Sequence, residues 1–111
     1  MTYNEFTTIT GWSENYMTYS DYEGYIEPVY NDSDLDKHIF CKALYKCHEK
    51  CVYTPVNMAI SAHSIEEKEA YLNGDEYIMS DVEALHESLK QTWLRALKSK
   101  VFQREYKLRR V

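Results

Sequence analysis

The chain has 111 residues, of which 44% are hydrophobic, and its 18 acidic and 13 basic side chains give a formal net charge of −5. This length and apolar share suffice for one modest core and exclude a chain that is disordered throughout. No apolar run approaches the roughly 18 residues that a membrane-spanning helix needs, so we expect no membrane contact.

The N-terminal segment, residues 1–31, is acidic and rich in tyrosine. Phe6–Thr10 is rich in β-branched residues and is followed by Gly11, which favours a short strand. Gly24 and Pro28 indicate that any helix here is short. Tyrosines recur at every third position, a period closer to a 3₁₀ or drifting helical stripe than to a strand. They are Tyr16, Tyr19, Tyr22 and Tyr25. We predict an irregular or short-β segment.

We predict short helices over residues 32–79. Asp32 or Ser33 would cap a helix that runs to about Cys51 along an apolar stripe. Thr54-Pro55 is typical of a second helix start, with Thr as the N-cap and Pro in the first helical position.

Residues 80–111 predict one long helix. Ser80-Asp81-Val82-Glu83 matches a capping box, and no Gly or Pro interrupts the residues that follow. Apolar residues recur at helical spacing. They are Val82, Leu85, Leu89, Trp93, Ala96 and Leu97. The predicted fold is mainly α, a small helical single domain over residues 1–111 with a long C-terminal helix whose end is basic.

Charge is separated along the chain. Residues 1–37 hold eight acids and one base, whereas residues 94–111 hold seven bases and one acid. Tyrosine combines an apolar body with a polar tip and is enriched at interfaces. The acidic, Tyr-rich side therefore predicts a surface for a protein partner that has a basic nucleic-acid-binding face. The predicted partner-binding residues are Glu14, Tyr16, Tyr19, Asp21, Tyr22, Glu23, Tyr25, Glu27, Asp32, Asp34 and Asp36.

The basic end forms a second predicted contact surface. The cations surround the helix axis rather than lining one side, and the chain is acidic overall, which is unlike a typical nucleic-acid reader. Three occupants remain open: the acidic N-terminal third of the same chain, the same segment of a second copy in a homodimer, or nucleic acid. The residues are Lys98, Lys100, Arg104, Lys107, Arg109 and Arg110.

Cys47, His48 and Cys51 are the strongest metal-ligand candidates, because thiolate and imidazole suit zinc. However, Cys47 and Cys51 lie on the apolar stripe, where free Cys behaves as a small hydrophobe, and no C-x-x-C occurs. We therefore predict no metal and no cofactor. Two alternatives to a protein-binding inhibitor stay open: a small nucleic-acid-binding regulator that uses the basic C-terminal helix, and a Cys/His zinc-binding module. Three cysteines without an export signal predict free thiols and a cytoplasmic location.

No catalytic signature is evident. Gly11, Gly24 and Gly74 are far apart, which excludes phosphate-binding and dinucleotide-binding glycine loops. Nucleophilic catalysis needs a nucleophile, a base and an orienting group, and no local motif groups them. We predict that the protein is not an enzyme.

The order of parts resembles the Ocr family of phage antirestriction DNA mimics. The resemblance rests on Met1-Thr2-Tyr3-Asn4, a capped Asp34-Leu35 helix, Pro55 opening a short helix, and a long helix that begins at Asp81-Val82 and carries Trp93. Ocr-like proteins are acidic to the C-terminus, whereas this chain turns basic at Arg95. The resemblance therefore implies a broader class, small phage-type anti-defence inhibitors of the antirestriction or anti-CRISPR kind, which would act in the host cytoplasm.

Overall fold

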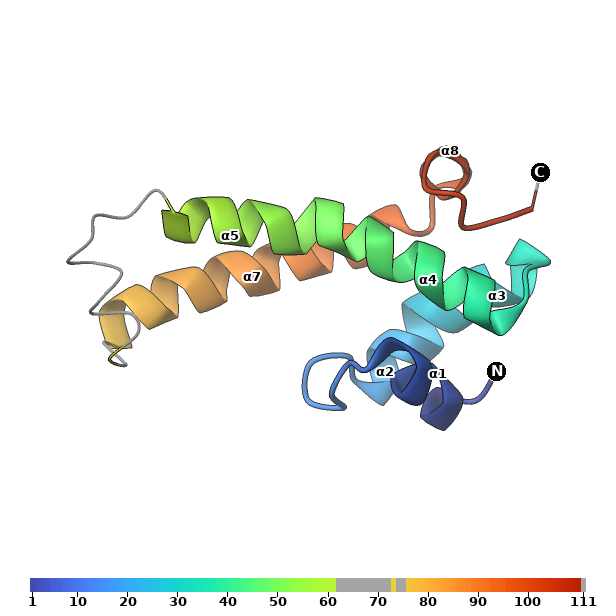
Figure 1. Ribbon diagram of the computed structural model, residues 1–111, viewed down its shortest axis with the longest axis horizontal. Coiled ribbons are helices and arrows are strands. Elements are labelled where there is room, and N and C mark those ends of the chain that lie inside the picture. The colour runs from blue at the N-terminus through green and yellow to red at the C-terminus, as the bar shows by residue number, and fades with distance from the viewer. Residues whose placement is uncertain (62–72, 74–75, 111) are drawn as a thin grey trace. The chain divides into compact units, whose positions relative to one another are not determined.

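The computed structural model describes residues 1–61, 73 and 76–110, with side chains described to residue 61, at 73 and from residue 82 to 110. The chain is mainly helical, as predicted, and the described residues contain no strand (Figure 1). Within the same residues, no helix has both the length and the apolar character that crossing a membrane requires.

Residues 6–10, predicted as a strand, belong instead to helix α1, Tyr3–Thr10. The Thr2 hydroxyl accepts from the Glu5 N–H at 3.1 Å, and the Glu5 carboxylate accepts from the Thr2 N–H at 3.0 Å. This reciprocal cap satisfies two backbone donors, which outweighs the modest β preference of the threonines. Gly11 ends the helix in the left-handed region at φ 76°.

The Tyr-rich segment is also more helical than predicted. Helix α2, Tyr19–Asp21, leads directly into the π-helix η1, Tyr22–Ile26, and then into α3, Glu27–Ser33. Pro28 has no N–H, and its ring would clash with the carbonyl four residues earlier in a regular α-helix. The wider π turn, in which the Glu27 N–H bonds to the Tyr22 carbonyl, comes immediately before Pro28 and lets the helix continue.

The second proline repeats this arrangement. Helix α4, Lys37–His48, is followed by the π-helix η2, Glu49–Tyr53, and by α5, Thr54–Ser61. The Thr54 N–H bonds to the Glu49 carbonyl, directly before Pro55. The predicted restart at Thr54-Pro55 is therefore a widened turn rather than a break in the helix.

The cap of α4 differs from the prediction. Asp32 and Ser33 lie at the end of α3, which stops because Asp34 adopts the left-handed conformation at φ 58°. The Asp36 carboxylate accepts from the His38 N–H at 2.9 Å and is the N-terminal cap of α4. Several neighbouring Asp and Ser residues can each cap a helix, so the turn at Asp34 decides which one does.

The predicted helix over residues 80–111 is wrong at both ends. Helix α7 spans Glu76–Ala96 and so already includes Ser80, which is not its cap. Helix α7 ends at Ala96. A separate helix α8, Lys100–Glu105, follows, and the Ser99 hydroxyl caps it by accepting a hydrogen bond from the Phe102 N–H. The buried Gln103 amide donates to the Leu97 carbonyl at 2.7 Å. This hydrogen bond satisfies a backbone carbonyl just beyond the end of α7.

The chain divides into two compact units: unit 1 comprises residues 1–47 and 94–111, and unit 2 comprises residues 48–93. Each unit buries apolar side chains from several helices. In unit 1 these include Phe6, Met17, Tyr22, Ile26, Phe40, Leu44, Leu94, Leu97 and Leu108; in unit 2 they include Val52, Val56, Val82 and Trp93. A single domain over residues 1–111 stays a prediction.

Two glycines give a matched test of this backbone. We expect Gly24→Ala to raise the free energy of unfolding by about 0.5–1 kcal/mol. Alanine has less conformational entropy than glycine in the unfolded chain, and its Cβ would meet open space in the folded chain. We expect Gly11→Ala to lower it by about 1 kcal/mol, because an alanine is strained at positive φ. Urea denaturation measures both, and equal shifts in the same direction would contradict the assigned backbone.

Candidate partner-binding surface

A connected set of aromatic rings underlies one face of unit 1. Tyr3 contacts Tyr19 edge-to-face and Tyr22 at a tilt, each with ring centroids 5.5 Å apart. The Tyr22 ring also contacts the Phe6 ring, with centroids 5.1 Å apart, and the Phe6 ring contacts the Trp12 ring, with centroids 5.8 Å apart. Offset and edge-to-face pairs add stability beyond the area that they bury, so the rings hold one another in place.

The network reaches solvent at both ends. Trp12 is half-buried and stacks on Tyr45 of α4 at 5.6 Å, and it also contacts Tyr16 at 6.5 Å. At the other end, Tyr19 is 58% exposed. Rigid aromatic side chains with one open face are the residues on which protein interfaces most depend.

The charges of two carboxylates act on this network. The Tyr3 hydroxyl donates to the Met17 carbonyl at 2.6 Å, and its pKa is raised by burial and then by the negative charges of Glu14 and Asp21. Both carboxylates therefore lie close enough to the Tyr3 phenol for their charge to act on it. We define the acidic aromatic surface as Trp12, Glu14, Tyr16, Tyr19, Asp21 and Tyr45.

Tyr22 does not belong to an exposed surface, contrary to the sequence prediction. It is almost fully buried, and its hydroxyl donates to the Met1 carbonyl at 2.6 Å. Burial raises its pKa to about 12. Tyr22 therefore belongs to the core of unit 1, whereas Tyr19, three residues earlier, stays exposed.

Several predicted carboxylates have structural roles instead. Asp21 accepts from the Thr18 N–H in the capping box of α2, Asp36 caps α4, and Asp32 pairs with Arg109 at 3.3 Å. The remaining four are half-buried or exposed and have no hydrogen bond or ion pair within the described residues. They are Glu14, Glu23, Glu27 and Asp34.

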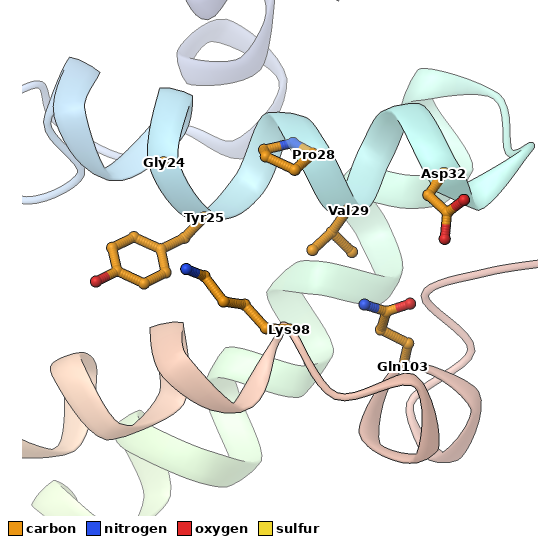
Figure 2. A pocket seen from close by; sticks show the side chains of 7 residues that line it. All are labelled: Gly24, Tyr25, Pro28, Val29, Asp32, Lys98 and Gln103. Atoms are coloured by element: carbon orange, nitrogen blue, oxygen red, sulfur yellow. The ribbon is translucent and has the colours of Figure 1, made fainter.

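An open cleft of about 240 Å³ lies between α3 and the C-terminal residues of unit 1 (Figure 2). At one end the Lys98 ammonium lies over the Tyr25 ring, 4.9 Å from its centroid. At the other end Asp32 and Gln103 face each other across the cleft. Each of these polar groups already has a partner inside unit 1, so we assign the cleft to packing. Its lining residues are Gly24, Tyr25, Pro28, Val29, Asp32, Lys98 and Gln103.

Part of the basic segment contacts the acidic third of the same chain, one of the three predicted occupants. Arg109 pairs with Asp32, and the Arg110 N–H donates to the Ser33 carbonyl at 2.7 Å. Because unit 1 includes both the acidic and the basic end of the sequence, it has nine acidic and ten basic side chains, whereas unit 2 has nine acidic and three basic side chains. The overall negative charge belongs to unit 2, and unit 1 is almost neutral.

The Cys and His candidates do not form a metal site in the described part of the chain, where no three His, Cys, Asp or Glu side chains are grouped to hold an ion. Cys47 and His48 are buried, and the His48 ring packs edge-to-face on Trp93 at 5.0 Å. Burial raises the pKa of the Cys41 thiol to about 11, so this cysteine is a poor nucleophile.

Sequence reasoning missed Trp12 and Tyr45 of this surface. Tyr45 lies off the apolar stripe of α4. An aromatic residue on the polar face of a predicted helix was the one sequence signal that could have indicated a contact surface there. Trp12 follows Gly11 in a loop, and its stacking on α4 joins residues 33 positions apart. Such a contact leaves no local pattern.

No family model, curated protein or solved structure matches this chain. The resemblance to the Ocr family stays a prediction.

Leu108 should anchor the C-terminal segment. We expect Leu108→Ala to lower the free energy of unfolding by about 2–5 kcal/mol, since the side chain is fully buried. Val101→Ala in the same segment should change it by less than about 0.5 kcal/mol, because Val101 is 72% exposed. Chemical denaturation followed by circular dichroism compares the two, and similar losses would contradict the docked segment.

His48 should make stability depend on pH. Burial, followed by the positive charges of His86 and Lys90, lowers its pKa from 6.5 to about 4. The unfolded chain therefore binds the proton more readily, and stability should fall as pH drops from about 6.5 towards 4. At about 1.36 kcal/mol per pKa unit, the loss is up to roughly 3 kcal/mol. In urea denaturation across this range, His48→Gln should flatten the dependence. His38→Gln, an exposed histidine of the same helix, should retain it, and identical profiles for the two variants would contradict the assignment.

Proposed function

We propose that this protein is a non-enzymatic inhibitor that binds a protein partner through the acidic aromatic surface. The partner is an enzyme of nucleic-acid handling or host defence, of the restriction or CRISPR type, and the contact is with its basic nucleic-acid-binding face. The observation that carries the proposal is an aromatic network that ends in the exposed Tyr19 ring and the half-buried Trp12 ring. The charge of Glu14 acts on Tyr3 of this network, and Glu14 has no hydrogen bond or ion pair within the described residues.

This combination suits arginine and lysine. A guanidinium stacks on an aromatic face and pairs with a carboxylate at the same time, and a lysine ammonium is attracted to the same negative ring face. The chain itself contains such a contact, since Lys98 lies over Tyr25. Basic nucleic-acid-binding faces are rich in both residues. The three free cysteines fit a reducing cytoplasm, where such enzymes act.

Recognition would depend on aromatic anchors more than on bulk charge. Duplex mimicry needs a dense and continuous set of negative charges. In unit 1 the acids are balanced by the basic C-terminal residues, and three of the predicted carboxylates are used in caps or an ion pair. We therefore propose an inhibitor with an aromatic centre and an acidic rim, the arrangement common to protein interfaces.

Tyr19 and Tyr53 offer a matched test, because they are 58% and 57% exposed and lie in different units. We expect affinity capture from a host lysate, followed by mass spectrometry, to recover basic nucleic-acid-binding enzymes with the wild type and with Tyr53→Ala. Tyr19→Ala should weaken binding to the recovered enzyme about 30-fold, or about 2 kcal/mol.

A charge-neutral variant separates charge from aromatic anchoring. Glu14→Gln should reduce the association rate with the recovered enzyme and the salt dependence of that rate, because charges at the rim of an interface steer encounter. Recovery of only acidic or neutral partners would overturn the proposal. Equal losses for Tyr19→Ala and Tyr53→Ala would do the same.

A further inference from the structure

The basic C-terminal segment, residues 98–110, is fixed to unit 1 along its inner side. Leu108 is fully buried, and the Gln103 amide donates to the Leu97 carbonyl. The Arg109 guanidinium and the Arg110 backbone N–H bind Asp32 and the Ser33 carbonyl respectively. The backbone of the segment is therefore attached to the rest of unit 1 at several points, and its exposed side chains project from this attached backbone.

Five cations of this segment are exposed, and one of them, Lys98, lies over the Tyr25 ring; the other four lack such a contact within the described residues. Their side chains have no hydrogen bond or ion pair in the part of the chain that the structure describes. We call them the outer basic surface: Lys100, Arg104, Lys107 and Arg110. Lys100 and Arg104 are four residues apart on α8 and share one helix face, with about 5–6 Å between neighbouring positions. Glu105 is the single acid in the segment.

We infer that the outer basic surface binds the phosphate backbone of a nucleic-acid duplex without reading its sequence. Unpaired like charges on a fixed surface repel one another, and an anionic partner relieves this repulsion. A duplex backbone presents phosphates at regular intervals, so cations spaced along a short helix and the turn after it can each meet one. Lysine and arginine contacts of this kind position a protein on nucleic acid and carry no base information.

The aromatic side chains of the segment favour a duplex over other anionic partners. Phe102 and Tyr106 are half-buried and contact each other at 4.7 Å. Their mutual packing leaves only part of each ring for insertion into a lipid headgroup layer, which surface-bound segments require. The same packing leaves less ring area for stacking on the bases of a single strand, which supplies much of single-strand affinity. Val101 is the one large apolar side chain of the described segment that is strongly exposed.

This inference goes beyond the proposed function, since it concerns other residues and another class of partner. A labelled DNA duplex titrated by fluorescence anisotropy at several salt concentrations tests it. Four phosphate contacts predict that log K falls with log salt at a slope of about −3.6. Removing two cations with Lys100→Gln and Arg104→Gln should reduce the slope to about −1.8.

The control variant is Lys42→Gln with Lys46→Gln. These exposed lysines lie four residues apart on α4, so the variant loses the same charge at the same spacing on another helix of unit 1. It should retain the wild-type slope. Glu105→Gln should strengthen binding, because it removes the only negative charge of the segment. Tyr19→Ala should leave duplex binding unchanged, which separates failure of this inference from failure of the proposed function.

Three outcomes would overturn the inference. The first is no anisotropy change at the lowest salt. The second is an equal loss of slope in the α4 control, which would mean that net charge alone is responsible. The third is tighter binding to a labelled single strand or to phosphatidylserine vesicles than to the duplex.

Discussion

The attachment of the C-terminal segment to α3 is the contact on which unit 1 depends. Burial of Leu108 supplies most of its free energy, because an exposed ion pair such as Arg109–Asp32 contributes at most about 1 kcal/mol. This attachment brings the two oppositely charged ends of the sequence into one unit. A chain that reads as an acidic N-terminal third and a basic tail is therefore folded into a nearly neutral body with local acidic and basic surfaces.

The two prolines show how the helices adapt to a local conflict. Each follows a π-helical turn whose final hydrogen bond comes from the residue immediately before the proline. Two tyrosines of η1 are used inside unit 1, since Tyr22 is buried in the core and Tyr25 lies under Lys98. The wider turn thus lets the helical stretch pass Pro28 without a break.

The exposed surfaces of unit 1 point to two kinds of recognition. Open rings beside carboxylates suit cationic side chains of a protein, and the unpaired cations of α8 and the following turn suit phosphates. Both would be useful to an inhibitor that meets an enzyme on nucleic acid. Each surface is rigid for its own reason, the first through ring packing and the second through the buried Leu108 and Gln103.

By itself, the sequence determined that the chain is mainly helical, because apolar periodicity along residues such as Phe40 and Leu44 or Trp93 and Leu97 is a local signal. It also located the two charged ends. Two features were not determined by the sequence: whether Phe6–Thr10 forms a strand or a helix, and that Asp36 caps α4. In each case, competing local free energies of about 1 kcal/mol are involved, and the neighbouring turns decide between them. Only the tertiary structure decided that Trp12 meets Tyr45, that Arg109 meets Asp32 and that Tyr22 is buried. Those contacts join residues far apart in the chain, and no spacing within the sequence encodes them.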